Sequence, residues 1–232
     1  MADRPTLFSG SMVRAILAGT KTQTRRVLTD VPAVERPGDY LDSYCGGERT
    51  AENPRGMTHT WNRWTADHRC GPSFKVSYVP GDRLWVREAW APNEAPGRDA
   101  ETIYRADIHD QVAGYSSSDG ISVSRWRPSI HMPRSRSRIT LRVTDVRVER
   151  LQGISNEDAI AEGVEPLGEF PAGTMRYRDY SGTLSGTGNA RRSFSTLWDS
   201  INGKKPGRTW ADNPWVAAIS FERESGDGRR KP

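Results

Sequence analysis

The sequence has few cysteines and no long apolar run, and each absence excludes a class of protein. The 232 residues contain only two cysteines, Cys45 and Cys70, which are too few for a disulfide scaffold and fit a reducing compartment. No stretch approaches the roughly 18 apolar residues of a membrane span, and the first ten residues lack the basic start and apolar run of a signal peptide. The sequence therefore predicts a cytoplasmic protein without a membrane partner.

Apolar residues are also scarce overall. They make up 34% of the chain, the mean hydropathy is -0.74, and glycine and proline contribute 22 and 15 residues. A chain of this length and composition predicts one domain with a modest core and many turns. We expect a single domain over residues 1–232, with insertions at about 29–79 and 166–189 and a flexible tail at about 225–232.

Positive charge is concentrated in one segment, residues 121–150. This segment holds eight arginines against Asp145 and Glu149, whereas the whole chain carries a net charge of only +5. An arginine-rich segment favours a partner that bears phosphate, so RNA or DNA is an expected partner of residues 121–150. The alternative is a charged surface that is merely solvated.

Three helices are predicted from their end signals. Residues 11–17 have Ser9 and Ser11 as possible N-caps and Gly19 as a C-terminal stop. Residues 155–163 begin with Ser155 and end with Gly163, and residues 191–203 carry an amphipathic pattern that ends at Gly203. In the second helix Asp158 occupies the capping-box position.

Strands are predicted in four places, and residues 116–120 are predicted to form a loop. The apolar alternation covers VPGDRLWVREAW at 79–90, ETIYRA at 101–106, RITLRVTDVRVERL at 138–151 and PWVAAISFER at 214–223. The alternation changes phase within the third segment, as strands of small barrels do. Without a regular strand-helix-strand repeat, the order of elements predicts an α+β fold that is mostly β, built on a small bent barrel.

The segment LAGTKTQTRR at 17–26 contains a lysine that needs an explanation. A phosphate-binding loop is excluded, because Thr20 rather than glycine precedes Lys21 and a helix rather than a strand comes first. Lys21 could contact phosphates together with the two arginines that follow. Alternatively, an ammonium that is partly buried beside guanidinium groups loses its proton more readily, so Lys21 could activate the hydroxyl of Thr24 as a nucleophile.

Four blocks of the sequence resemble a known family, the ASCH domain, a relative of the PUA fold. The blocks are ILAGTKTQTRR, PGDRLWV, ITLRVTDVRVERL with SNEDAIAEG, and PWVAAISFE, and they cover roughly half of the chain. With its REAW and RWRPSIHMPR motifs, the chain is similar to long ASCH proteins of bacteriophages and prophages. The resemblance implies a PUA-like (ASCH) small bent β-barrel with short flanking helices and long loop insertions, in a bacterial or phage-infected cell.

Within this family, small bacterial members are amidohydrolases that remove the acetyl group from N4-acetylcytidine. By motif, the resemblance implies catalytic roles for Lys21, Thr24 and Glu162 and substrate binding by Arg26. Thr24 would attack the amide carbonyl with Lys21 as its base, and Glu162 would serve the leaving amine and the water. Arg26 or backbone amides would stabilise the oxyanion. The expected substrate is an N4-acylated cytosine nucleoside or a related modified nucleotide, with no cofactor.

The longer form adds three candidate substrate-binding residues, Trp90, His131 and Arg134. Aromatic rings stack on bases and arginine forks bind phosphate, although core packing and a solvated loop are the alternatives. Cys45, His59, His68 and Cys70 have zinc-compatible side chains, but their spacing does not follow the paired pattern of structural zinc sites, so no metal is predicted. The alternative to a hydrolase is a non-catalytic PUA-like module that binds RNA or modified DNA.

Overall fold

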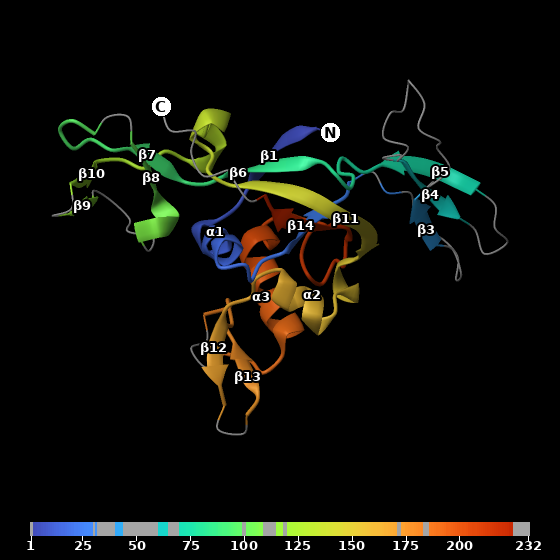
Figure 1. Cartoon of the computed structure of the whole chain (residues 1–232). Helices are drawn as coiled ribbons and strands as arrows, with labels where there is room; N and C mark the ends of the chain where they lie inside the picture. Colours follow the sequence, from blue (N-terminus) through green and yellow to red (C-terminus); the bar gives the residue numbers. More distant parts are fainter. Residues whose placement is uncertain are drawn as a thin grey trace. The chain divides into compact units, whose positions relative to one another are not determined.

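The chain forms two compact units in the computed structural model (Figure 1). Unit 1 contains residues 22–81 and 143–221, and unit 2 contains residues 2–21, 82–142 and 222–232. The structure describes residues 2–29, 31, 40–43, 60–64, 70–98, 101–108, 115–117, 120–170, 173–182 and 186–224. The tail predicted at 225–232 lies outside the described residues.

Unit 2 is built on a mixed sheet. Strand β1 (Asp3–Leu7) pairs in parallel with β6 (Arg83–Arg87), and β6 pairs antiparallel with the first residues of β11 (Thr140–Arg150). Leu84 and Leu141 face each other across this second pair, and both are fully buried. Strand β11 begins in unit 2 and continues along the chain into unit 1.

Helix α1 (Gly10–Leu17) in unit 2 confirms the first predicted helix. The Ser9 side chain accepts a hydrogen bond from the backbone N–H of Met12, so Ser9, one of the two candidate serines, is the N-cap. Val13 and Ile16, three residues apart, are buried, and Gly19 follows the helix with φ +76°.

The rest of unit 2 consists of short elements. They are β7 (Trp90–Pro92), β8 (Thr102–Tyr104), η1 (Arg105–Ile108), β9 (Tyr115–Ser117), β10 (Ile121–Val123), η2 (Ser129–His131) and η3 (Arg134–Arg136). The prediction of a loop at 116–120 is wrong for Ser116 and Ser117, which pair with β10. Serine favours turns only weakly, and pairing with a neighbouring strand overrides that preference.

Unit 1 contains a three-stranded arrangement in the order β11, β14 (Trp215–Arg223) and β2 (Gln23–Val27). Strands β14 and β2 are antiparallel, and Ala218 pairs with Arg25 while Ile219 pairs with Thr24. Within the predicted insertion at 29–79, a separate antiparallel sheet contains β3 (Tyr40–Ser43), β4 (Thr60–Trp64) and β5 (Cys70–Lys75).

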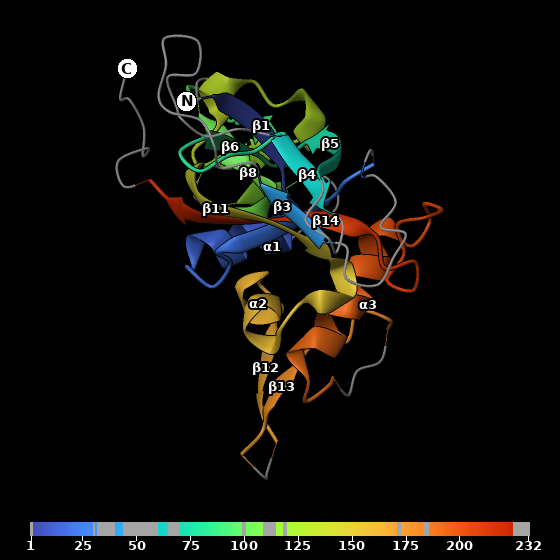
Figure 2. The ribbon, with the colours of Figure 1, turned by 90° about the vertical axis from the view of Figure 1, so that its right-hand side faces the viewer.

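Two helices and a short 3-10 turn in unit 1 share a core with β14. The turn is η4 (Leu151–Gly153), and the helices are α2 (Asn156–Ala161) and α3 (Ala190–Asn202), which lie together in both views (Figures 1 and 2). Their buried cluster contains Leu151, Ile154, Ala159, Val164, Ala190, Phe194, Leu197, Trp198 and Val216. Both predicted helices are confirmed. The buried face of α3 ends at Trp198, and the next apolar residue of the helix, Ile201, is 50% exposed.

A β-hairpin in unit 1 corrects the prediction of a loop at 166–189. Strands β12 (Pro166–Glu169) and β13 (Met175–Tyr177) pair antiparallel, and Figure 2 shows them extending from the end of unit 1 that carries α2 and α3. All four residues of β12 are exposed, so the sequence lacks the apolar alternation that marks a half-buried strand. At the hairpin's base Tyr177 bridges Thr187, and a Cβ added to Gly186 (φ +67°) would lie 2.7 Å from the Tyr177 carbonyl oxygen.

The coarse fold prediction is confirmed and the barrel is not. The described elements are mostly strands with few helices, as an α+β class requires. In each unit the described strand order is linear, so no barrel closes within the part of the chain that the structure describes. Among those residues, no helix has both the length and the apolar character to cross a membrane.

Capping of α2 generates the first prediction. The Ser155 hydroxyl accepts a 3.0 Å hydrogen bond from the backbone N–H of Asp158, so Ser155→Ala should lower the free energy of unfolding by about 1 kcal/mol. Ser155→Asn, which keeps an acceptor at the N-cap, should lower it by a few tenths of that value at most. Urea unfolding followed by circular dichroism measures both, and equal stability of wild type and Ser155→Ala would contradict the cap.

Candidate functional site

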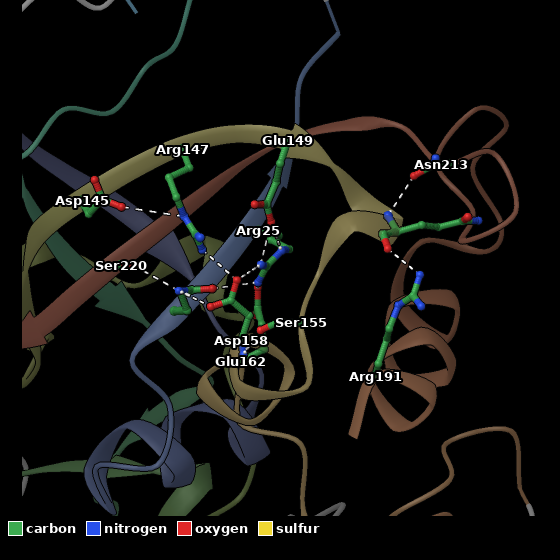
Figure 3. A network of polar contacts seen from close by, with 12 residues as sticks. Arg25, Asp145, Arg147, Glu149, Ser155, Asp158, Glu162, Arg191, Asn213 and Ser220 are labelled. Carbon is green, nitrogen blue, oxygen red and sulfur yellow. Dashed lines mark hydrogen bonds and ion pairs between the residues drawn. The ribbon is translucent and has the colours of Figure 1, made fainter. Parts of the chain in front are cut away.

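Polar side chains of unit 1 surround one buried arginine, Arg25, on strand β2 (Figure 3). The side chain of Arg25 is fully buried. It makes five hydrogen bonds, as many as a guanidinium has N–H donors. The Nε and Nη2 atoms donate to Glu149 Oε1 at 3.0 and 2.7 Å, and Nη2 also donates to Asp158 Oδ2 at 2.9 Å. The Nη1 atom donates to Gln23 Oε1 at 2.9 Å and to Glu162 Oε1 at 3.2 Å.

The local structures explain why these side chains meet. Successive residues of a strand point to opposite faces, so Gln23 and Arg25 share the face of β2 that carries their bonds to α2. Asp158 and Glu162 lie four residues apart, on the same side of α2 and its C-cap. Glu149 comes from the end of β11. The Phe194 ring of α3 lies 5.9 Å from Arg25 Cζ and helps to exclude water.

Asp158 accepts hydrogen bonds from three side chains. It accepts hydrogen bonds from Arg25, from Arg147 Nη2 at 2.8 Å and from Gln23 Nε2 at 3.1 Å. Burial acts to raise its pKa, but the bonds from Arg147 and Gln23 and the charges of Arg147 and Arg25 outweigh burial, so the pKa of Asp158 lies below its ordinary value of 3.8. Gln23 Nε2 also donates to Ser220 Oγ on β14.

The three predicted catalytic residues are all buried. Exposure is 2% for Lys21, 5% for Thr24 and 4% for Glu162. Lys21 belongs to unit 2, where its Nζ lies 5.7 Å from the centre of the Phe8 ring. Thr24 and Glu162 belong to unit 1.

Thr24 and Glu162 differ in their surroundings. Glu162, the C-cap of α2, accepts from Arg25, so the structure joins it to the arginine group. Alternation along β2 turns the Thr24 side chain to the opposite face from Arg25, and no hydrogen bond within the described part of the chain engages its hydroxyl. Arg26, half-buried, shares the face of Thr24.

The predicted substrate-binding residues of unit 2 have separate surroundings. Trp90 is buried, with the guanidinium carbons of Arg127 and Arg136 at 4.9 and 5.9 Å from its ring centre. Arg134 is half-buried, bonds to Asp3 and lies over the ring of Trp85. His131 is exposed on η2. The structure therefore gives Trp90 and Arg134 different partners within unit 2.

Most arginines of residues 121–150 have partners inside their own unit. Four of them pair with carboxylates, namely Arg134 with Asp3, Arg138 with Glu88 and Asp107, Arg142 with Glu222 and Arg147 with Asp158. Arg127 and Arg136 stack on Trp90, and Arg150 stacks on Trp215. Much of the segment's positive charge is therefore compensated within the protein.

Glu88 is a buried carboxylate of unit 2 that sequence reasoning did not single out. Arg138 holds both of its oxygens with bonds of 2.9 and 3.1 Å. Burial raises the pKa of Glu88, and the hydrogen bond and charge of Arg138 oppose that rise only in part. Arg138 also binds Asp107 and lies over the Tyr104 ring, 3.9 Å from its centre, which fixes the fork in place.

Metal binding finds no support among the described residues, which contain no cluster of three or more histidine, cysteine, aspartate or glutamate side chains suited to a metal ion. The three carboxylates around Arg25 enclose a guanidinium instead. Of the four zinc-compatible residues, Cys45, His59 and His68 lie outside the described residues, and Cys70 begins β5.

The arginine group is the part of the site that the sequence interpretation missed. The sequence predicts Arg25 as a phosphate contact or as one of the guanidinium groups beside Lys21, and it predicts no site role for Gln23, Glu149 and Asp158. A signal was present in the spacing, because Gln23 and Arg25 share a strand face and Asp158 and Glu162 share a helix face. Pairing those two faces requires the tertiary fold.

The chain was also compared with known proteins. No family model, curated protein or solved structure matches it. The chemistry of the site therefore has to be argued from its own residues.

The lowered pKa of Asp158 gives a pH-dependent prediction. A carboxyl whose pKa is lower in the folded state stabilises the fold above its ordinary pKa, and this contribution disappears as the pH falls through the folded value. Asp158→Asn should therefore lower the melting temperature clearly at pH 7, and the difference from wild type should shrink as the pH falls below 3.8. Thermal unfolding at several pH values measures this, and a difference that is constant with pH would refute the assignment.

Proposed function

We propose that this protein is an amidohydrolase of the ASCH type that removes the acyl group from an N4-acylated cytosine nucleoside or a related modified nucleotide. Thr24 is the nucleophile, Lys21 its base, and Glu162 the residue that serves the leaving amine and the water. The observation that carries the proposal is the burial of Lys21, which is 2% exposed.

Burial separates the two interpretations of this lysine. A lysine that contacts nucleic-acid phosphates needs its ammonium at the surface. Lys21 is buried, so a role inside a site explains its position better than a phosphate contact does. Thr24 and Glu162 are similarly buried, and a site shielded from water strengthens the electrostatic interactions that catalysis uses.

The end of α2 lies beside Thr22 within unit 1. The backbone N–H of Thr22 donates a 2.8 Å hydrogen bond to the carbonyl of Ala161. Thr22 stands between Lys21 and Thr24 in the chain, and Ala161 directly precedes Glu162. This bond between neighbours of the proposed residues supports a role for Glu162 together with Thr24.

The proposed reaction has two steps. In the first, the Thr24 oxygen bonds to the acyl carbonyl carbon, its proton passes to Lys21 Nζ, and the bond between the carbonyl carbon and N4 breaks as N4 takes up a proton through Glu162. In the second, Glu162 takes a proton from water, and the water oxygen bonds to the carbonyl carbon of the Thr24 ester. The bond between that carbon and the Thr24 oxygen breaks, Lys21 Nζ returns its proton to the Thr24 oxygen, and the carboxylic acid leaves. Arg26 or backbone N–H groups stabilise the oxyanion in both steps.

The alternative, a non-catalytic module that binds RNA or modified DNA through residues 121–150, has less support. Four of its arginines pair with carboxylates of the same unit and three stack on tryptophan. Charges that are compensated inside the protein contribute less to binding phosphates.

Hydrolysis of N4-acetylcytidine tests the proposal. The wild-type protein should release cytidine and acetate, and Thr24→Val or Lys21→Met should lower kcat by at least about 10³-fold, because each removes a group of the covalent step. Thr22→Val is the matched control: Thr22 is exposed and two residues away, and its kcat should stay within about 3-fold of wild type. Chromatography of the products measures all four proteins.

Two results would overturn the assignment. Full activity of a folded Thr24→Val variant would remove the nucleophile. No turnover by the wild type, combined with oligonucleotide binding that weakens steeply with salt, would instead favour the binding module.

A further inference from the structure

We propose that Arg25 is a positioning residue for Glu162, an inference that rests on the proposed hydrolase. The Nη1 group of Arg25 donates to Glu162 Oε1 at 3.2 Å, and both residues are buried. Arg25 would hold the carboxylate in the orientation that serves the leaving amine, without itself touching the substrate.

The orientation of the guanidinium is fixed from several elements. Glu149 on β11 accepts from Nε and Nη2, Asp158 on α2 accepts from Nη2, and Gln23 on β2 accepts from the same Nη1 that serves Glu162 (Figure 3). A planar group bonded along all its edges has little freedom to rotate. Its bond to Glu162 therefore fixes the orientation of the Glu162 carboxylate, which a single point charge would not do.

Stability alone does not explain an arginine at this position. A buried ion pair is often no more stable than apolar side chains of similar volume. Here one guanidinium lies among three carboxylates, and Asp158 also pairs with Arg147, whose side chain is 45% exposed. Apolar side chains in place of the ion pair would also remove the Glu162 carboxylate. The buried arginine is therefore explained better if that carboxylate is needed at a defined place.

The Arg25→Lys substitution distinguishes the effect of the positive charge from the effect of the planar guanidinium. Arg25→Lys keeps one positive charge but offers three donors on a flexible stem instead of a planar fork. If Arg25 only neutralises charge, lysine should largely restore both stability and activity. If Arg25 positions Glu162, lysine should restore stability relative to Arg25→Met while activity stays low.

The first test measures N4-acetylcytidine hydrolysis by Arg25→Lys, Arg25→Met and Arg147→Met. Arg25→Lys should fold cooperatively and keep KM within about 3-fold, while kcat falls by about 10- to 100-fold, because a displaced catalytic group loses rate rather than substrate affinity. Arg147→Met removes the other cation on Asp158 and should keep kcat within about 2-fold. A folded Arg25→Lys variant with kcat within 2-fold of wild type would overturn the proposal.

The second test does not depend on activity. Urea unfolding of Arg25→Met, Glu162→Gln and the double variant forms a double-mutant cycle. The double variant should lose less stability than the sum of the single losses, because each single change already removes the Arg25–Glu162 bond and the double change removes it only once. Additive losses would overturn the Arg25–Glu162 coupling. If the coupling is present and the wild type still shows no hydrolysis, the proposed function fails and the structural coupling stands.

Discussion

Unit 1 is organised by the compensation of one buried positive charge. The guanidinium of Arg25 has left water entirely, so each of its N–H groups needs an acceptor inside the protein. Those acceptors come from β2, from β11 and from α2, whose residues lie up to 137 positions away in the chain. The hydrogen bonds of Arg25 thus hold β2 against α2. The apolar cluster around Phe194 and Trp198 adds hydrophobic contacts within the same unit.

Elements with local signals were predictable from the sequence, and those without them were not. Helices α1 and α2 begin at Ser9 and Ser155 as predicted, because a serine hydroxyl that caps a helix acts within three residues. Strand β14 alternates and is buried, so its period is visible. The β12–β13 hairpin is exposed and β9 is made of serine and tyrosine, so neither carries an apolar period. Their existence depends on pairing partners instead.

The candidate site divides in the same way. Lys21 and Thr24 were chosen by motif and because a lysine three residues before a hydroxyl can activate it, and their burial is consistent with a chemical role. Glu162 was chosen by motif, and its contact with Arg25 could not be predicted from spacing. The arginines of residues 121–150 show the converse, since Arg138 and Arg142 meet carboxylates of their own unit. Net charge in a segment does not measure charge available at a surface.

Gly186 sets a limit on how this protein can vary. Its backbone lies in the left-handed region, and the space that a side chain would need is taken by the Tyr177 carbonyl oxygen. Alanine at this single position would push the backbone at Gly186 and Thr187 away from β13, and the bridge between Tyr177 and Thr187 would be lost. The segment that leads into α3 is therefore held to the hairpin only as long as no side chain stands at this position.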